Sequence, residues 1–131
     1  MSTIAAALRT PVSRIVLFIL AMKAALLLYT GLAHGVLENE SISELGQLLR
    51  LWMQWDSLHY LAVAEHGYTS EGERRFFIVF FPLFPLLIRV VSAVTADYHH
   101  AALVVSTVAS VGAGVLLYRL TRLELGEQVA E

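Results

Sequence analysis

The segment Trp52–Tyr68, WMQWDSLHYLAVAEHGY, gathers one aspartate, one glutamate, two histidines and four large aromatic residues between apolar runs. If the segment is helical, Asp56 shares a face with His59 and Tyr60, because surface neighbours on a helix are about three or four residues apart. A carboxylate at a water–lipid boundary can accept a proton from a sugar hydroxyl. An aromatic ring beside it, such as that of Trp55, can stack on the apolar face of a sugar. The segment therefore carries suitable groups for transfer to a hydroxyl acceptor.

A basic pair, Arg74 and Arg75, follows this segment. Guanidinium forks fit phosphate oxygens, so an acid, aromatic rings and this pair near a membrane suit transfer of a sugar from a lipid phosphate. Each residue also has a structural interpretation. Asp56 can be a helix-surface residue and His59 a hydrogen-bonding residue, while the tryptophans can be interface anchors and the arginines a solvated or headgroup-facing pair. Spacing alone leaves both interpretations open.

Other chemistries lack their sequence signals. His59, Glu65 and His66 do not have the HExxH zinc spacing, and the chain has no cysteine for a thiolate metal site or a disulfide. Neither a glycine-rich phosphate loop nor a nucleophile elbow is present in the sequence. The net charge of -2 gives no general attraction to nucleic acid. We therefore expect no metal, no cofactor and no nucleic-acid partner.

The rest of the chain is apolar enough to place this segment beside a membrane. Hydrophobic residues make up 57% of the chain and charged residues 15%, against about 45–50% and about 25% in soluble domains. A spanning helix needs roughly 17–25 mostly apolar residues. The sequence predicts spanning helices at about 14–37, 78–96 and 101–119, with the long loop 38–75 between the first two. The first run is too long for a signal-peptide core of about 7–15 residues, so we expect it to be retained.

The long loop is expected to contain an amphipathic helix that lies in the membrane interface. Apolar residues recur in it at spacings of three and four, a pattern typical of one helical stripe. Ser41 or Ser43 can cap its start and Gly67 can end it. The residues of the stripe are Leu45, Leu48, Leu49, Trp52 and Trp55. The predicted fold class is therefore all-α, a polytopic membrane helical bundle of three spanning helices with one interfacial helix.

The second apolar run contains Pro82 and Pro85, which are tolerated in a first helical turn but not mid-helix. We expect the regular helix to begin near Pro82, after an irregular entry. Arg89 then lies inside the membrane segment, where an arginine is a functional candidate, although an internal ion pair or snorkelling explains it equally well. The third run carries a face of small residues suited to close helix packing. These are Ser106, Ser110, Gly112 and Gly114.

Charge does not decide the orientation in the membrane. Arg9 and Arg14 favour a cytoplasmic N-terminus. With three spans, the same topology places Arg119 and Arg122 outside, against the positive-inside rule.

Two motifs, in order, resemble those of a known family. The first is W-D-S-x-H-[FY]-L followed by A-x-x-G-Y, and the second is F-F-P-[LF]-[FY]-P. The matching residues are Trp55, Asp56, Ser57, His59, Tyr60 and Leu61; Ala64, Gly67 and Tyr68; and Phe80, Phe81, Pro82, Leu83, Phe84 and Pro85. The chain resembles, over about residues 15–125, the PIG-V-like mannosyltransferases that add the second mannose to glycosylphosphatidylinositol anchors, and their bacterial relatives. These belong to the GT-C class of glycosyltransferases.

The resemblance implies a multispanning helical enzyme whose first long loop faces away from the cytoplasm. It implies a polyprenyl- or dolichyl-phosphate sugar as donor, usually of mannose, a hydroxyl of a glycan or glycolipid as acceptor, and inversion at the anomeric carbon. Asp56 falls at the position of the loop acid that deprotonates the acceptor, with His59 and Tyr60 in support. Arg74 and Arg75 as phosphate contacts are inferred from the residues alone.

Length is the main departure from the family, whose members continue with many more spanning helices. We therefore expect the chain to be the N-terminal part of a larger enzyme, inactive as an isolated piece. The expected location is the bacterial cell membrane, or the endoplasmic reticulum membrane in a eukaryote. A non-catalytic membrane scaffold or assembly protein is the alternative, and Lys23 with Arg89 in the membrane favours, more weakly, a transporter fragment.

Overall fold

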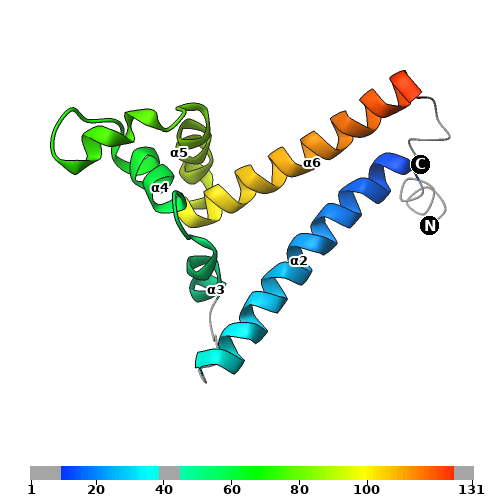
Figure 1. Ribbon diagram of the computed structural model, residues 1–131, viewed down its shortest axis with the longest axis horizontal. Coiled ribbons are helices and arrows are strands. Elements are labelled where there is room, and N and C mark those ends of the chain that lie inside the picture. The colour runs from blue at the N-terminus through cyan, green and yellow to red at the C-terminus, as the bar shows by residue number, and fades with distance from the viewer. Residues whose placement is uncertain (1–9, 39–44, 126–131) are drawn as a thin grey trace. The chain divides into compact units, whose positions relative to one another are not determined.

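The computed structural model describes residues 10–38 and 45–125, which form helices connected by turns and contain no strand (Figure 1). The elements are α2 (Pro11–Glu38), α3 (Leu45–Trp52), α4 (Ser57–His66), the 3₁₀ helix η1 (Glu73–Val79), α5 (Leu83–Thr95) and α6 (Tyr98–Leu125). This confirms the predicted all-α class. The described residues fall into two compact units, one up to Tyr29 and from Thr107 onward, the other Thr30–Ser106.

Two helices, α2 and α6, are long and apolar enough to cross a membrane, with 28 residues each. A helix of that length extends about 42 Å, more than the hydrocarbon core of about 30 Å. The second apolar run behaves differently. The 13-residue helix α5 is shorter than the roughly 17 residues that a span requires. Only η1 and α5 together are long and apolar enough to cross a membrane, and the two helices are bent by 107° relative to each other. This bent pair is either a broken span or a re-entrant loop.

The start of α5 confirms the expectation from the prolines. The helix begins at Leu83, directly after Pro82, whose backbone carbonyl accepts a hydrogen bond from the Leu86 N–H at 3.0 Å. Pro85 falls in the first turn, where its missing N–H costs no helical hydrogen bond.

The loop contains helices as predicted, but the prediction of one continuous helix is wrong, because the chain turns at residues 53–56 and separates α3 from α4. Trp55 has a φ of 58°, in the left-handed region, which interrupts the helix. A turn closes there through Ser57, whose hydroxyl donates to the Gln54 carbonyl at 2.7 Å. Gly67, with a φ of 79°, ends α4 as predicted. The proposed caps Ser41 and Ser43 lie outside the described residues.

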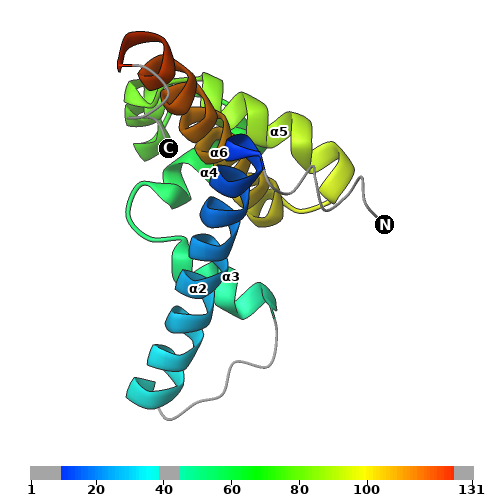
Figure 2. The same cartoon turned by 90° about the vertical axis from the view of Figure 1, so that its right-hand side faces the viewer.

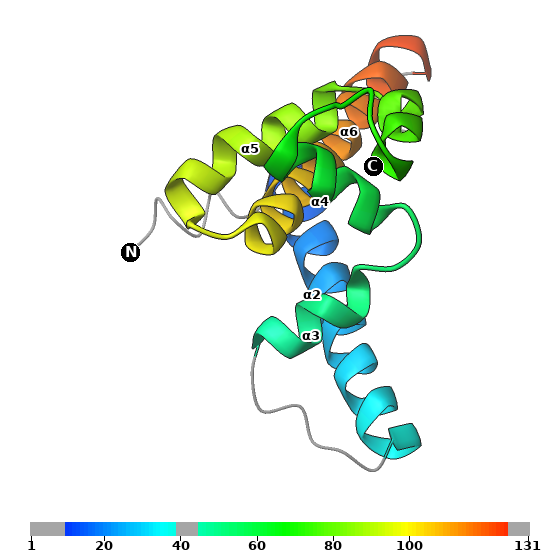
Figure 3. The ribbon, with the colours of Figure 1, turned by 90° about the vertical axis from the view of Figure 1, so that its left-hand side faces the viewer.

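The break lets α3 and α4 pack on different helices. In α3, the Trp52 indole donates to the Thr30 hydroxyl at 2.9 Å, and Leu49 is fully buried, so α3 lies against the later part of α2 (Figure 2). Helix α4 instead packs with α5 and the first turns of α6 (Figure 3). The buried cluster that joins these three helices consists of Leu61, Ala64, Ile88, Ala101, Ala102 and Val105. Its three alanines allow close approach of the helix backbones.

In the other unit, the predicted small-residue face of α6 contacts α2 at Gly114. A Cβ at this position would lie 2.7 Å from Ile19 Cδ1 and 3.2 Å from Ile15 Cγ2, closer than side chains normally approach. At Gly112 a Cβ would meet nothing within 4 Å. Gly114 is therefore the residue that admits the close contact.

We expect Gly114→Leu to lower the free energy of unfolding by about 1–3 kcal/mol, since overpacking forces neighbouring side chains and backbone to move. Thermal unfolding in lipid nanodiscs, followed by circular dichroism, measures the change. Gly112→Leu is the matched control, because it adds the same side chain to the same helix where space is open. Equal loss in both variants would contradict the packing explanation, because leucine meets open space at position 112 and has a higher helix propensity than glycine.

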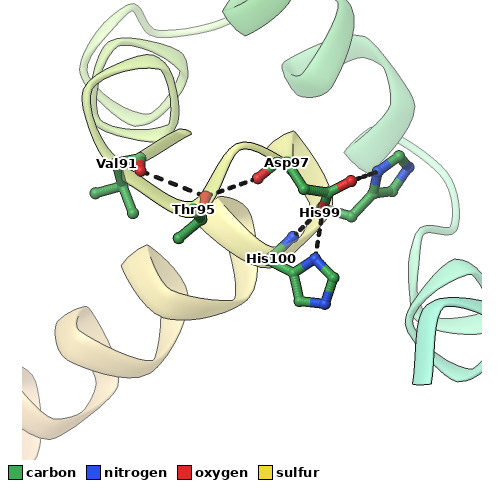
Figure 4. A network of polar contacts seen from close by, with 5 residues as sticks. All are labelled: Val91, Thr95, Asp97, His99 and His100. Atoms are coloured by element: carbon green, nitrogen blue, oxygen red, sulfur yellow. Dashed lines mark hydrogen bonds and ion pairs between the residues drawn. The ribbon is translucent and has the colours of Figure 1, made fainter. Parts of the chain in front are cut away.

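The turn from α5 to α6 is built around one carboxylate (Figure 4). The Asp97 Oδ1 accepts from the His100 backbone N–H at 2.7 Å and contacts His100 Nδ1 at 2.9 Å, while His99 Nδ1 lies 3.7 Å from Oδ2. The Thr95 hydroxyl donates to the Asp97 carbonyl at 2.9 Å. Asp97 thus caps the start of α6, and both histidines interact with the cap.

The hydrogen bond from the His100 N–H holds the pKa of Asp97 below its ordinary value of 3.8, assisted by the His100 side chain and opposed by partial burial. Because the folded pKa is depressed, the stabilisation is present above the ordinary pKa of 3.8 and is lost as the pH falls through the lower folded pKa. We expect this acid-dependent loss in thermal unfolding curves of the wild type and not of Asp97→Asn, which keeps the cap acceptor. Asp97→Ala should cost about 0.5–2 kcal/mol at neutral pH. Identical acid profiles for wild type and Asp97→Asn would contradict the assignment.

Candidate active site at the start of helix α4

Asp56 immediately precedes α4 and presents an exposed carboxylate. Its backbone carbonyl accepts from the His59 and Tyr60 N–H groups at 3.0 and 3.1 Å, which begins the helix. Its side chain makes no capping hydrogen bond. A capping residue usually has extended backbone angles, whereas Asp56 is already helical with φ -67° and ψ -12°, which accounts for the missing capping bond. The carboxylate therefore remains accessible to another molecule.

Trp55, next to this carboxylate, is the most exposed large apolar side chain described, at 91% of its maximal surface. It also has the left-handed φ that interrupts the helix. A bulky residue in this conformation costs energy, and such residues concentrate at functional sites. An exposed indole held beside a carboxylate is suited to contact with a sugar face or with lipid headgroups.

His59 and Tyr60 join the first motif to the second. The His59 ring lies 4.6 Å from the Phe77 ring and 5.4 Å from that of Phe80, measured between centroids. The Tyr60 ring meets Phe80 and Phe84 edge-on at 4.9 and 5.3 Å. Such edge-on contacts are favourable and directional. The aromatic cluster of these five residues fixes the first turn of α4, and with it the position of Asp56.

Sequence reasoning did not identify the cluster partners Phe77, Phe80 and Phe84 as site residues, nor Tyr68. The Tyr68 hydroxyl donates to the Phe80 carbonyl at 2.7 Å and so holds the chain between η1 and α5. The one available signal was that Tyr68, Phe80 and Phe84 belong to the two motifs.

Arg74 and Arg75 lie exposed on η1. The Arg75 guanidinium is 4.7 Å from the ring centre of Phe76, a cation–π contact. Among the described residues, neither arginine has a carboxylate within 4.0 Å, and no contact joins either one to Asp56. The structure thus unites Asp56, His59 and Tyr60 but leaves the basic pair as a neighbouring surface feature.

Arg89 is exposed and has no ion pair within the described residues, but its guanidinium is bound to backbone carbonyls. Its Nε donates to the Ala64 carbonyl at 2.6 Å and its Nη2 to the Glu65 carbonyl at 3.2 Å. These carbonyls belong to the last turn of α4, where the helix itself offers no donors. Arg89 therefore ties α5 to the end of the helix that carries Asp56 at its start.

The family model described as Mannosyltransferase (PIG-V) matches residues 11–130. This match, together with two helices long and apolar enough to cross a membrane, defines a membrane glycosyltransferase. The chain belongs to the mannosyltransferase (PIG-V) family, which confirms the resemblance seen in its two motifs. No curated protein and no solved structure matches the chain.

Proposed function

We propose that the protein transfers mannose from a polyprenyl- or dolichyl-phosphate donor to a hydroxyl group of a glycan or glycolipid, with Asp56 as the general base. The family supports sugar transfer in a membrane. The observation that carries the finer proposal is the accessible carboxylate of Asp56, which makes no capping bond and is positioned by the aromatic cluster.

The proposed reaction uses this carboxylate to remove the acceptor's proton. The acceptor oxygen then forms a bond to the anomeric carbon as the bond between that carbon and the phosphate oxygen breaks, with inversion. The proton passes to Asp56, and the lipid phosphate leaves with the electron pair of the broken bond. Trp55 contacts the sugar, His59 and Tyr60 hold the start of α4, and Arg74 and Arg75 attract the donor phosphate to the surface.

A donor comparison tests the proposal. Membranes that contain the protein are supplied with radiolabelled polyprenyl-phosphate mannose or with GDP-mannose, in the presence of an inhibitor that blocks conversion of the second into the first. We expect label to reach glycan or glycolipid only from the lipid-linked donor. Transfer from GDP-mannose under these conditions would refute the donor class.

Family membership favours an enzyme over the scaffold and transporter interpretations of the sequence. Arg89, on which the transporter interpretation depends, is held by backbone carbonyls of α4. We further propose that the loop with Asp56 faces away from the cytoplasm, in the bacterial cell membrane or the endoplasmic reticulum membrane. A lipid-linked donor requires the site to lie at the membrane surface, and the side is taken from the resemblance to the family.

A further inference from the structure

A pocket of about 230 Å³ lies where the end of α4 meets the start of α5, and it is separate from the exposed carboxylate of Asp56. Its walls are mainly apolar, and its one charged side chain is Arg89. The lining residues are Val63, Gly67, Tyr68, Pro82, Pro85, Leu86 and Arg89. Gly67 and Tyr68 close the first motif and the two prolines belong to the second, so both motifs contribute to this pocket.

The Arg89 guanidinium is held in place before any ligand arrives. Its two hydrogen bonds to the Ala64 and Glu65 carbonyls fix its plane and occupy two of its five N–H donors. The remaining donors have no partner within residues 10–38 and 45–125. Binding to such a fixed group does not have to pay for ordering a flexible side chain.

The charge of Arg89 is also unbalanced locally. None of the described carboxylates lies within 4.0 Å of the guanidinium. The Glu65 side chain instead lies 3.7 Å from His66 Nε2. Arg89 is exposed, and an arginine inside a membrane segment is a functional candidate by default.

The pocket's chemistry suits a phosphate group attached to an apolar chain. A guanidinium fork matches phosphate oxygens, and the walls of Val63, Pro85 and Leu86 match hydrocarbon. Gly67 adjoins the guanidinium, since a Cβ at this position would lie 3.9 Å from Arg89 Nη2, an ordinary contact. The volume is below the about 300–1,000 Å³ of sites that hold whole drug-sized ligands, and therefore suits a headgroup with its first few carbons.

We propose that this pocket binds the phosphate end of a prenyl monophosphate, with Arg89 as the phosphate ligand. This assignment rests on the proposed function, in which such a lipid is the leaving group. The exposed Arg74 and Arg75 attract the lipid, and Arg89 holds it after the sugar has moved.

The test is binding of radiolabelled farnesyl monophosphate to the protein in phosphatidylcholine nanodiscs, with farnesol and inorganic phosphate as competitors. We expect Arg89→Gln to weaken binding about ten- to a hundredfold, as for loss of a charged hydrogen bond, and Arg119→Gln, an exposed arginine outside the pocket, to leave it unchanged. Unaltered binding in Arg89→Gln, or equal competition by farnesol, overturns the proposal. Equal competition by inorganic phosphate identifies free phosphate as the ligand and overturns the lipid assignment.

A second variant covers the possibility that Arg89→Gln unfolds α4. Leu86→Trp fills the pocket from α5 and leaves both Arg89 hydrogen bonds intact. We expect it to abolish binding with unchanged circular dichroism, and retained binding would again overturn the proposal. Asp56→Asn should bind farnesyl monophosphate like the wild type. Undiminished sugar transfer in Asp56→Asn, with Arg89-dependent binding preserved, would therefore count against the proposed function and not against the pocket.

Discussion

Asp56→Asn is expected to reduce sugar transfer from the lipid-linked donor by about 10²–10⁴-fold, the usual range for loss of a general base. Asparagine keeps the size of the side chain and its helix-start preference but cannot accept the acceptor's proton. The His59 and Tyr60 N–H groups bond to the backbone carbonyl of this residue, so α4 should begin as before. The loss should therefore appear in kcat rather than in KM for the donor.

The matched control is Glu71→Gln, which removes another exposed carboxylate from the same loop. It should leave transfer unchanged, since Glu71 lies outside the aromatic cluster and the Arg89 pocket. Initial rates in membranes, normalised to the amount of inserted protein, provide the measurement. Full activity of Asp56→Asn would remove this residue as the base.

The second prediction concerns membrane topology. We expect η1 and α5 to form a re-entrant loop rather than a third span. The start of α2 packs on the later turns of α6, seen as blue beside orange in Figure 1. Gly114 lies 16 residues after the start of α6 at Tyr98, whereas its contact Ile15 lies 4 residues after Pro11. In a parallel pair with level ends, this 12-residue difference would separate them by about 18 Å, so the contact favours antiparallel spans.

Two antiparallel spans also remove the conflict over charge. Arg14 at the start of α2 and Arg119 and Arg122 near the end of α6 then all lie on the cytoplasmic side, as the positive-inside rule requires. With three spans, the last two arginines lie outside. The sharp bend of 107° between η1 and α5 fits a segment that enters and leaves the membrane on the same side.

Cysteine labelling distinguishes the two topologies, because the chain has no cysteine of its own. Single replacements at Glu71, Ala96 and Glu124 are treated in intact cells with a membrane-impermeant maleimide. We expect labelling at Glu71→Cys and Ala96→Cys and none at Glu124→Cys. The three-span path gives the reverse result at positions 96 and 124 and the same result at position 71. Labelling at 124 with protection at 96 would therefore exclude the re-entrant loop.

Hydropathy was sufficient to predict the long helices, since a run of apolar residues has few other solutions in a membrane. Proline chemistry was sufficient to place the start of α5. The break between α3 and α4 was not predictable, because the three- and four-residue spacing continues through Trp55 without interruption. Only the packing of Trp52 on Thr30 and of Leu61 in the buried cluster separates the two helices.

The candidate site was predicted only where its residues are close in sequence. Asp56, His59 and Tyr60 are neighbours along one helix, so their grouping follows from local geometry. The contact of His59 with Phe77 depends on how η1 folds back, which no local pattern specifies. The role of Arg89 was missed for a related reason, since its acceptors are backbone carbonyls and every residue has one.

The turn at residues 53–56 places Asp56 between two helices that have different packing partners. Helix α3 contacts α2 through the Trp52 hydrogen bond. Helix α4 contacts α5 through the Arg89 hydrogen bond and the aromatic rings. If either support shifts, the torsion angles of these four linking residues absorb the displacement first. The carboxylate could therefore be repositioned by a small rotation at the joint, while both helices keep their own packing.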